Sequence, residues 1–447
     1  MSSMMRPHRP AHPSPASRPG IMARRDSILW TLIAPANVMA AIWLLALATF
    51  AYVSQFRDDL LYFRFMASQE NLWDQATGLS FVWLGFAFGA FLLGTMIVPR
   101  RIGTPSPAAR GWSDARATRM LFIAFAVVAS VAFLWLGVTV VKVGLGRLIA
   151  LAASDNIHAR ELILNGAFPG GRMISNGFIG LAVFSAMLLA KSRPVPLSVT
   201  TKLMIGVIFV ISLTYLGVVP ILTSGRINFF AAIFASYIAI CVVKRRIYGV
   251  IYLPIGALLV AVVWTAKQYF SLGHVMQVSM FDQSFQGVIF YLYNDMLNAL
   301  NVIGHVGDHY QWGYHSLRFV YFFTFTDGVV LKFISSSSYH LAPYIGGGEY
   351  PMLTAPYVDF GLFGLAVLTA LGAFSQYAFL KARADPAMGA LYGIVCAGLL
   401  LSVHSSYLTL QDPVFSMIMV AGLVFLSNGS AGRGRGRSPQ PGERRPS

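Results

Sequence analysis

The sequence predicts an all-α protein that crosses a membrane many times, and two observations carry this prediction. Of its 447 residues, 56% are hydrophobic and only 11% are charged, which excludes a soluble globular chain. Apolar stretches of spanning length recur from residue 28 to residue 426, with charged connections between them. We therefore expect about ten transmembrane helices and a large external loop that contains short amphipathic or re-entrant helices.

The placement of charge decides what the formal net charge of +16 means. The expected cytoplasmic segments hold 23 of the 33 Lys and Arg residues but only four of the 17 acidic residues. Basic charge confined to alternate connections is the positive-inside pattern of membrane proteins. This pattern predicts that both termini are cytoplasmic, and it is not the footprint of a nucleic-acid-binding protein.

The expected spans divide the chain into five regions. Residues 1–27 and 428–447 are basic tails whose composition predicts disorder, 28–267 hold spans one to seven, 268–356 form a large periplasmic loop, and 357–427 hold spans eight to ten. In chain order, the expected spans are 27–53, 79–98, 120–143, 173–190, 203–222, 227–243, 247–266, 357–380, 388–410 and a last one that ends at residue 426.

Charged connections separate these spans and set their direction. The first connection, 54–78, is acidic and suits the outer face, whereas 99–119 carries five arginines and suits the cytoplasm. The third span opens into an external loop, 144–172. Lysine and arginine return at 244–246 and again at 381–383, where the sixth and eighth spans end.

The long loop, 268–356, is the one long polar and aromatic segment between apolar spans. It carries five acidic residues against two basic ones, and it holds five of the nine histidines. Loops of this length usually carry function. Segments 285–303 and 314–333 are apolar enough to dip into the bilayer, but each contains charge, so we predict amphipathic or re-entrant helices. Twelve spans would preserve the same topology and stay open as an alternative.

Arg226 lies at the outer tip of the hairpin between spans five and six. A planar guanidinium beside Gly225 and the N-terminal amides of the next helix suits an anion such as phosphate. The alternative is an arginine that snorkels to the interface. Arg160 and Arg172 flank a Gly-rich turn in the preceding external loop, where they either close on the same anion or are solvated.

Polar residues of the long loop recur at helical spacing. Asn294, Asn298, Asn301, His305 and Asp308 are separated by four, three, four and three positions, which places them on one face of a helix. Two interpretations stay open: an interfacial amphipathic helix with a wet side, or a polar wall that binds a sugar. We expect no metal site, because no second cluster of ligands accompanies these histidines.

The end of the loop carries a more specific signal. Tyr357 and Asp359 lie where the loop becomes a helix, and Gly361 and Gly364 permit close packing. Asp359 either complements the helix dipole or acts on a substrate hydroxyl as a general base. His404, within the ninth expected span, is more typical of a satisfied core histidine, although an ionisable residue at membrane depth also suggests function.

The order of these features resembles the Wzy family of O-antigen and exopolysaccharide polymerases. The residues that carry the resemblance are Ser224-Gly225-Arg226 at an outer hairpin and the block TAPYVDFGLFG at 354–364, after a large penultimate external loop. The layout is similar from residue 28 to residue 426, but only these two stretches match in residues. The Asn-Thr that usually precedes the final block is replaced here by 349–354, which begins with Glu349.

The resemblance implies an enzyme of the bacterial inner membrane. Such an enzyme moves a growing glycan from undecaprenyl diphosphate to a new lipid-linked repeat unit at the periplasmic face, without nucleotide, metal or other cofactor. Expected partners are these lipid-linked glycans, membrane lipids, and the flippase and chain-length regulator of the same pathway. The expected catalytic residues are Arg226, Asp359 and His305. The expected substrate-binding residues are Arg160, Arg172, Arg318, Asn298, Asn301, Glu349 and Tyr357.

Two alternatives remain beside the polymerase. An O-antigen ligase has a similar layout, but transfers the finished glycan to a lipid A core. A secondary transporter belongs to a different class; the sequence shows neither the internal repeat nor the pair of discontinuous helices that this class favours.

Overall fold

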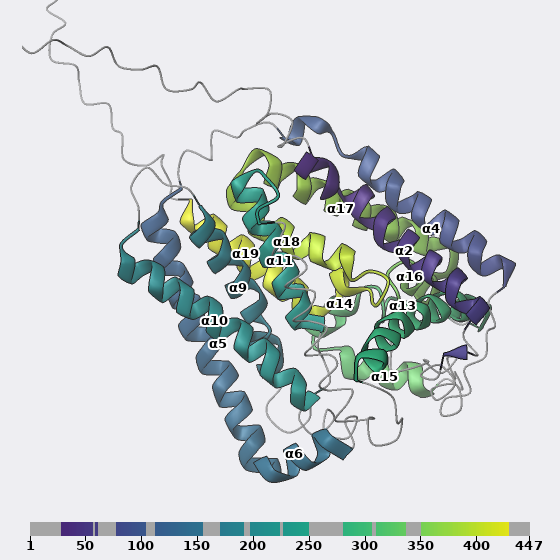
Figure 1. The fold of residues 1–447 in the computed structure, drawn as a ribbon, viewed down its shortest axis with the longest axis horizontal. Coiled ribbons are helices and arrows are strands. Elements are labelled where there is room, and N and C mark those ends of the chain that lie inside the picture. Colours follow the sequence, from purple (N-terminus) through teal and green to yellow (C-terminus); the bar gives the residue numbers. More distant parts are fainter. Residues whose placement is uncertain are drawn as a thin grey trace, which may run out of the picture.

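A computed structural model describes residues 28–56, 59–60, 77–103, 112–154, 170–191, 197–223, 227–249, 280–305, 310–336 and 350–428 (Figure 1). Within these ranges every named element is a helix. The longer helices are α2 (Pro35–Phe56), α4 (Gly78–Ile97), α5 (Asp114–Val143), α9 (Gly177–Ala190), α10 (Val199–Thr223), α11 (Ile227–Lys244), α13 (Met280–His305), α17 (Gly364–Ala384), α18 (Gly389–Leu400) and α19 (Gln411–Ser427). The shorter ones are η2 (Arg100–Gly103), α6 (Leu145–Ser154), α8 (Gly171–Ser175), α14 (Arg318–Phe323), α15 (Asp327–Ser336), α16 (Ala355–Phe360), η5 (Gly361–Phe363), η6 (Pro386–Met388) and η7 (Tyr407–Thr409).

The helices confirm a polytopic membrane architecture. Seven helical segments among the described residues are long and apolar enough to cross a membrane, and two shorter apolar ones, Pro386–Leu400 and Gln411–Ser427, accompany them. The expected seventh span, 247–266, and both tails lie almost entirely outside the described residues. The total of ten or twelve spans therefore stays a prediction.

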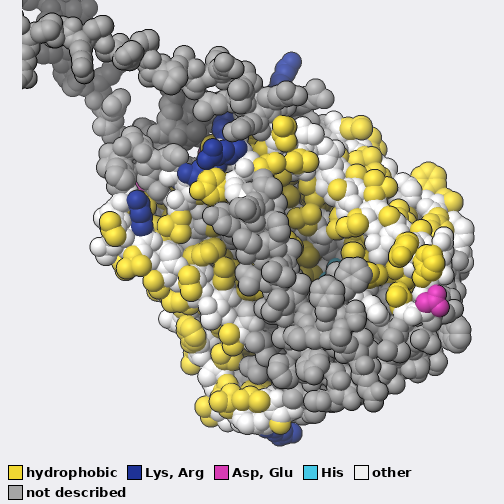
Figure 2. Space-filling model, viewed as in Figure 1, with side chains coloured by type: hydrophobic (Ala, Val, Ile, Leu, Met, Phe, Trp, Pro, Cys, Tyr) yellow, Lys and Arg dark blue, Asp and Glu magenta, His cyan; other side chains and the backbone are white. Residues whose placement is uncertain are grey.

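Most of the described lysines and arginines gather at one end of the bundle, which we call the basic end; most of the dark blue side chains in Figure 2 lie there, in the upper part of the view. Asp114, at the start of α5, meets Lys191, just after α9, at 3.3 Å between Oδ1 and Nζ. The Lys191 ammonium also lies 4.1 Å from the ring centre of Trp112. Among the described residues, the basic end is defined by Arg101, Arg116, Arg119, Lys191, Lys202, Lys244, Arg245, Arg246, Lys381 and Arg383.

The first helices of the chain pack against the last ones, and small residues allow the contact. In α4, a Cβ added to Gly94 would collide with the backbone of Thr369 in α17. In the reverse direction, a Cβ on Gly372 of α17 would collide with the backbone of Phe91. The two helix backbones therefore touch, as in other membrane helix pairs with small residues at the interface.

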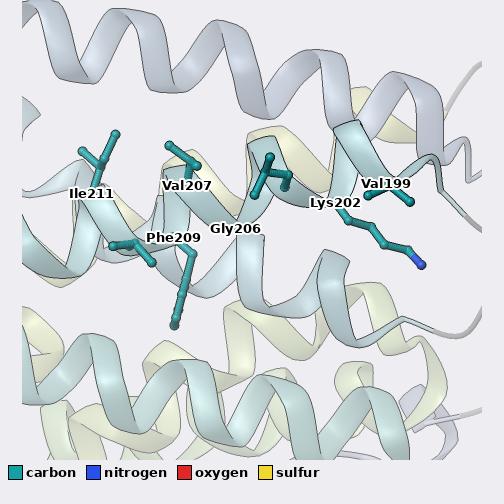
Figure 3. A pocket seen from close by; sticks show the side chains of 8 residues that line it. Val199, Lys202, Gly206, Val207, Phe209 and Ile211 are labelled. Atoms are coloured by element: carbon teal, nitrogen blue, oxygen red, sulfur yellow. The ribbon is translucent and has the colours of Figure 1, made fainter.

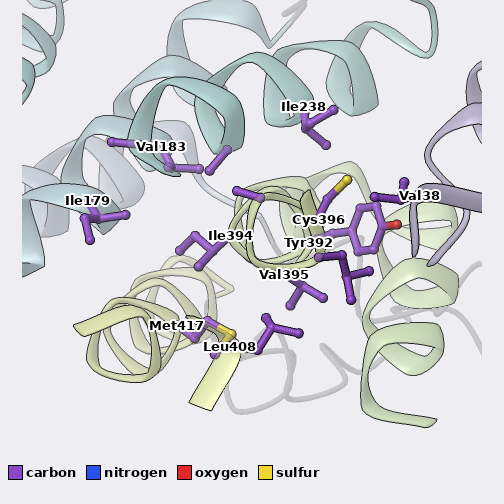
Figure 4. Close-up of a cluster of buried hydrophobic side chains, with 14 of the residues drawn as sticks. Val38, Ile179, Val183, Ile238, Tyr392, Ile394, Val395, Cys396, Leu408 and Met417 are labelled. Carbon is purple, nitrogen blue, oxygen red and sulfur yellow. The ribbon is translucent and has the colours of Figure 1, made fainter. Parts of the chain in front are cut away.

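Helix α18 lies at the centre of the bundle. Figure 4 shows Tyr392 and Cys396 of this helix directed towards Val38 of α2 and Ile238 of α11, with Met417 of α19 on another side. The Tyr392 hydroxyl donates a hydrogen bond to the carbonyl of Ile33. Because neighbours surround α18, its apolar side chains are almost all buried.

Three expected elements differ from the structure. The ninth expected span, 388–410, is helical only as far as Leu400; beyond it, the Thr409 hydroxyl bonds to the side chain and carbonyl of Ser406, a local bond that favours a turn over a continued helix. The eighth, 357–380, is interrupted at Gly361, whose φ of +57° an α-helix cannot contain. The expected amphipathic segment 285–303 is part of α13, which is buried on its apolar side and on its polar side alike.

Candidate functional site

Polar buried side chains gather at the end of the bundle opposite to the basic end, around the irregular segment 401–410. Helix α18 has 12 residues, so it spans about 18 Å at 1.5 Å per residue, less than the roughly 30 Å of a hydrocarbon core. The chain therefore continues without regular helix at membrane depth, which is tolerated only where protein buries the backbone or a cavity exposes it. Here the backbone is bonded to the end of the long loop: Met352 N–H donates to the carbonyl of Ser402 at 2.8 Å, and Ser406 N–H to that of Tyr350 at 3.0 Å.

A histidine and an aspartate form the first cluster. Nδ1 of His404, in segment 401–410, lies 3.1 Å and 3.0 Å from the two carboxylate oxygens of Asp295, in the middle of α13. The Asp295 side chain is 5% exposed, whereas that of His404 is 34% exposed. The ring of Tyr291, one turn before Asp295, lies 6.3 Å from the imidazole. A carboxylate held on Nδ1 fixes the ring and its tautomer, and leaves Nε2 as the atom suited to proton exchange.

The polar face of α13 surrounds this pair. Asn294, Asn298 and Asn301 are buried on the same helix as Asp295. These amides do not face water, so the interpretation of this segment as an interfacial helix with a solvated polar face is wrong. The interpretation of the polar face as a sugar-binding surface stays a prediction. Helix α13 ends at His305, whose side chain lies outside what the structure describes.

Asp359 forms the second cluster, and its carboxylate is saturated. It is fully buried in α16, and it accepts hydrogen bonds from the backbone N–H of His315 at 3.1 Å and of Ser316 at 2.6 Å. The Ser316 hydroxyl donates a further bond at 2.5 Å. The main chain adds two more links, from Gln311 N–H to the carbonyl of Val358 and from Trp312 N–H to that of Asp359. This geometry is that of an anchor for segment 311–316.

His315 occupies the centre of that anchored segment as a neutral ring. Its Nε2 lies 2.6 Å from Oε1 of Gln311, and its ring lies nearly perpendicular to that of Tyr350, at 4.5 Å between ring centres. Burial lowers the pKa of His315 to about 3, and the nearby positive charge of Arg318 acts in the same direction. At neutral pH the imidazole is therefore uncharged, and it forms part of the packing.

Two expected substrate-binding residues lie beside this segment. Arg318 opens α14, with its guanidinium 5.2 Å from the ring centre of Tyr314 and 3.8 Å from the carboxylate of Asp327. Tyr357, one turn into α16, lies half-buried with its ring 4.6 Å from that of Trp83. Both contacts hold the side chain against protein groups, and a role in binding substrate stays a prediction for each.

Arg172 belongs to a third cluster, which joins α8, α11 and α19. Its Nη2 lies 3.9 Å from Oδ2 of Asp412, the second residue of α19. The same Oδ2 accepts a hydrogen bond from Nδ2 of Asn228 at 2.9 Å, and that amide also donates to Oδ1 of Asn176 at 3.2 Å. The Tyr407 hydroxyl donates to Oδ1 of Asn228 at 3.0 Å. In this cluster, the partly exposed guanidinium of Arg172 lies next to a buried network of polar side chains.

Three more expected site residues lie outside the described ranges: Arg226, Arg160 and Glu349. Asp412, Asn228, Ser316 and Asp295 were not singled out as site residues. Asp412 lies two residues after the ninth expected span, and Asn228 is the second residue of the span after the predicted hairpin. Polar residues at span ends were therefore the available signal. Among the described residues, no group of three or more His, Cys, Asp or Glu side chains is arranged to hold a metal ion.

A pocket on the outside of α10 has a different character (Figure 3). It is lined by Val199, Lys202, Leu203, Gly206, Val207, Phe209, Val210 and Ile211. Its one charged group, Lys202, lies towards the basic end, and the rest of the lining is apolar. A largely apolar surface of this kind suits a lipid chain.

Comparison with known proteins adds no family assignment. The sequence matches no protein-family model, and no curated protein is similar to it. A functional proposal therefore depends on the geometry of the buried polar clusters and on the resemblance of the two short motifs.

Proposed function

We propose that this chain is a membrane glycosyltransferase that polymerises oligosaccharide repeat units linked to a polyprenyl diphosphate, at the periplasmic face of a bacterial inner membrane. The observation that supports it most is the pair of Asp295 in α13 and His404 in the irregular segment 401–410, at the end of the bundle opposite to the basic end. A positive-inside orientation puts the basic end in the cytoplasm and the pair towards the periplasm. Lipid-linked glycans are assembled into polymers on that side.

The chemistry requires a proton acceptor at the sugar hydroxyl. The hydroxyl oxygen of the acceptor sugar bonds to the anomeric carbon of the growing glycan, while the bond from that carbon to the diphosphate oxygen breaks. Nε2 of His404 takes the hydroxyl proton, and Asp295 stabilises the resulting imidazolium. The lipid diphosphate leaves with the electron pair of the broken bond. This assignment puts His404 in the role expected for Asp359 or His305.

The diphosphate leaving group requires cations. Arg172 and Arg318 supply guanidinium groups at this end, and Arg226 and Arg160 remain predicted contributors from outside the described residues. A guanidinium presents donors that match phosphate oxygens. Asn298 and Asn301 of α13 remain predicted contributors to sugar binding, since amides carry both donors and acceptors.

The lipid-linked glycans of a deletion strain test the function. Accumulation of a single lipid-linked repeat unit is the expected result for a polymerase. Accumulation of full-length lipid-linked polymer would instead assign a ligase, because polymerisation would then be intact while transfer to the lipid core failed. A normal glycan profile would contradict both transferases and favour a transporter.

Purified protein tests the assigned base. His404→Gln keeps a polar side chain but cannot take a proton, so polymer formation from lipid-linked repeat units should fall by about 10²–10⁴-fold. Asp114→Asn, which alters an ion pair at the basic end, is the matched control and should polymerise normally. Unchanged polymer formation in folded His404→Gln would exclude this histidine as the base.

A further inference from the structure

In the contact between Arg172 and Asp412, the arginine side chain is partly exposed, whereas the carboxylate is buried and held by other residues. The Arg172 side chain is 40% exposed and its Nη2 is 3.9 Å from the carboxylate, too far for a hydrogen bond. The Asp412 side chain is only 7% exposed. A guanidinium has five N–H donors, so with respect to the described residues most of those on Arg172 remain available to a second acceptor.

The fixed side depends on a chain of buried amides and a phenol. Asn228 holds Oδ2 of Asp412 at 2.9 Å, and Asn228 is itself held by the Tyr407 hydroxyl and by Oδ1 of Asn176. The main-chain carbonyl of Asn176 accepts a bond from Ser416, one turn beyond Asp412 in α19. This network ties α8, α11, α19 and segment 401–410 to one another. The carboxylate of Asp412 is therefore the fixed partner in its contact with the more exposed Arg172 side chain.

Two buried polar atoms in the network have no hydrogen-bond partner among the described residues. They are Oδ1 of Asp412 and Nδ2 of Asn176. A buried acceptor without a donor is costly, and it favours any nearby positive charge. Asp412 thus has a reason to attract Arg172 beyond the bond that Asn228 already makes.

We propose that Asp412, held by Asn228 and Tyr407, is a positioning residue that orients the Arg172 guanidinium towards the diphosphate of a polyprenyl diphosphate. The proposal rests on the proposed function and names the residues that prepare its anion-binding group. Asp412 restricts where the exposed side chain of Arg172 can lie, so that its outward donors are preorganised for two phosphate oxygens. Such preorganisation lowers the entropy lost on binding.

Simple charge competition makes the opposite prediction. If Asp412 only neutralised Arg172, its carboxylate would compete with the diphosphate, and Asp412→Asn would tighten binding. If Asp412 orients Arg172, the same substitution weakens binding. The direction of the change therefore separates the two effects.

The experiment measures binding of polyprenyl diphosphate to the full chain in lipid nanodiscs, for the wild type, Asp412→Asn, Arg172→Ala and the double variant. Asp412→Asn should raise the Kd about fivefold, in the range found for residues in direct contact. The double variant should bind as Arg172→Ala does, because Asp412 acts through that arginine. Asn228→Ala should weaken binding in the same direction, and it replaces Asp412→Asn if that variant does not fold. Asp114→Asn is the control.

Three results would overturn the proposal. Tighter or unchanged binding by Asp412→Asn would show that the carboxylate competes or is irrelevant. A loss of the same size in the Arg172→Ala background would show a structural role, since a positioning residue has no effect without the group that it positions. If the wild type itself does not bind polyprenyl diphosphate, the proposed function fails, and this inference fails with it.

Discussion

Asp295 and Asp359 are both buried aspartates near the same end of the bundle, but their surroundings differ in kind. Asp359 accepts two backbone N–H groups and a serine hydroxyl, which are donors that never release a proton at ordinary pH. Asp295 instead faces the imidazole of His404, a ring with two nitrogens that can each donate or accept a hydrogen bond. The two aspartates differ in the groups that donate hydrogen bonds to them, not in how deeply they are buried. Fixed donors make Asp359 a structural anchor, whereas contact with a histidine suits Asp295 to a role in proton transfer.

Asp295→Asn should give the largest effect on activity. The amide keeps the size of the side chain but cannot stabilise an imidazolium, so polymer formation should fall by about 10²-fold or more. Thermal unfolding of the purified variant should remain close to that of the wild type. Normal activity with an unchanged pH profile would place the His404 contact among ordinary core interactions.

Asp359→Asn should act on stability instead. An amide offers one oxygen where the carboxylate offers two, and its NH₂ group faces the N–H donors of His315 and Ser316. We expect a loss of about 1–3 kcal/mol in the free energy of unfolding. Polymer formation per folded molecule should fall much less than in Asp295→Asn. A loss of about 10²-fold in a stable protein would restore Asp359 as the base.

Gly361→Ala should weaken the same anchored region by a smaller amount. Gly361 has a φ of +57°, and a Cβ there would lie 2.5 Å from the Tyr310 hydroxyl. The left-handed backbone alone costs roughly 1–2 kcal/mol for a residue with a side chain. Gly328→Ala is the matched control, because a Cβ at that position meets nothing within 4 Å. Equal melting temperatures for the two variants would show that the turn at 361 is more adaptable than its geometry suggests.

Acidification should also destabilise the anchored region, by an amount that grows as the pH falls. The folded His315 has a pKa of about 3, whereas a histidine in the unfolded chain has a pKa of about 6.5. Between these values the unfolded state binds the extra proton, so stability falls as the pH is lowered from 6.5, by at most about 1.4 kcal/mol per pH unit. His315→Gln should flatten this dependence in melting curves taken between pH 4 and pH 7. An identical slope in that variant would assign the acid sensitivity to other groups.

The sequence allowed the helices to be predicted better than the site. Apolar runs and flanking charges located α4, α9 and α11 to within a few residues, because length and hydropathy are local properties. The pairing of Asp295 with His404 joins residues that are 109 positions apart, and no local pattern encodes such a contact. Burial of the polar face of α13 likewise depends on partners elsewhere in the chain, so a period of three and four residues was compatible with either a wet or a dry side.

Helices α4 and α17 are in close contact, but the ribosome makes them at very different times. Helix α4 is complete at Ile97, but the helix whose backbone it touches begins only at Gly364. At about 5–20 residues per second, the ribosome needs on the order of 15 to 50 s to make the chain between them. During that interval the surface of α4 around Gly94 lacks the helix that it finally contacts. The described part of the bundle therefore closes late, when the last third of the polypeptide inserts against the first.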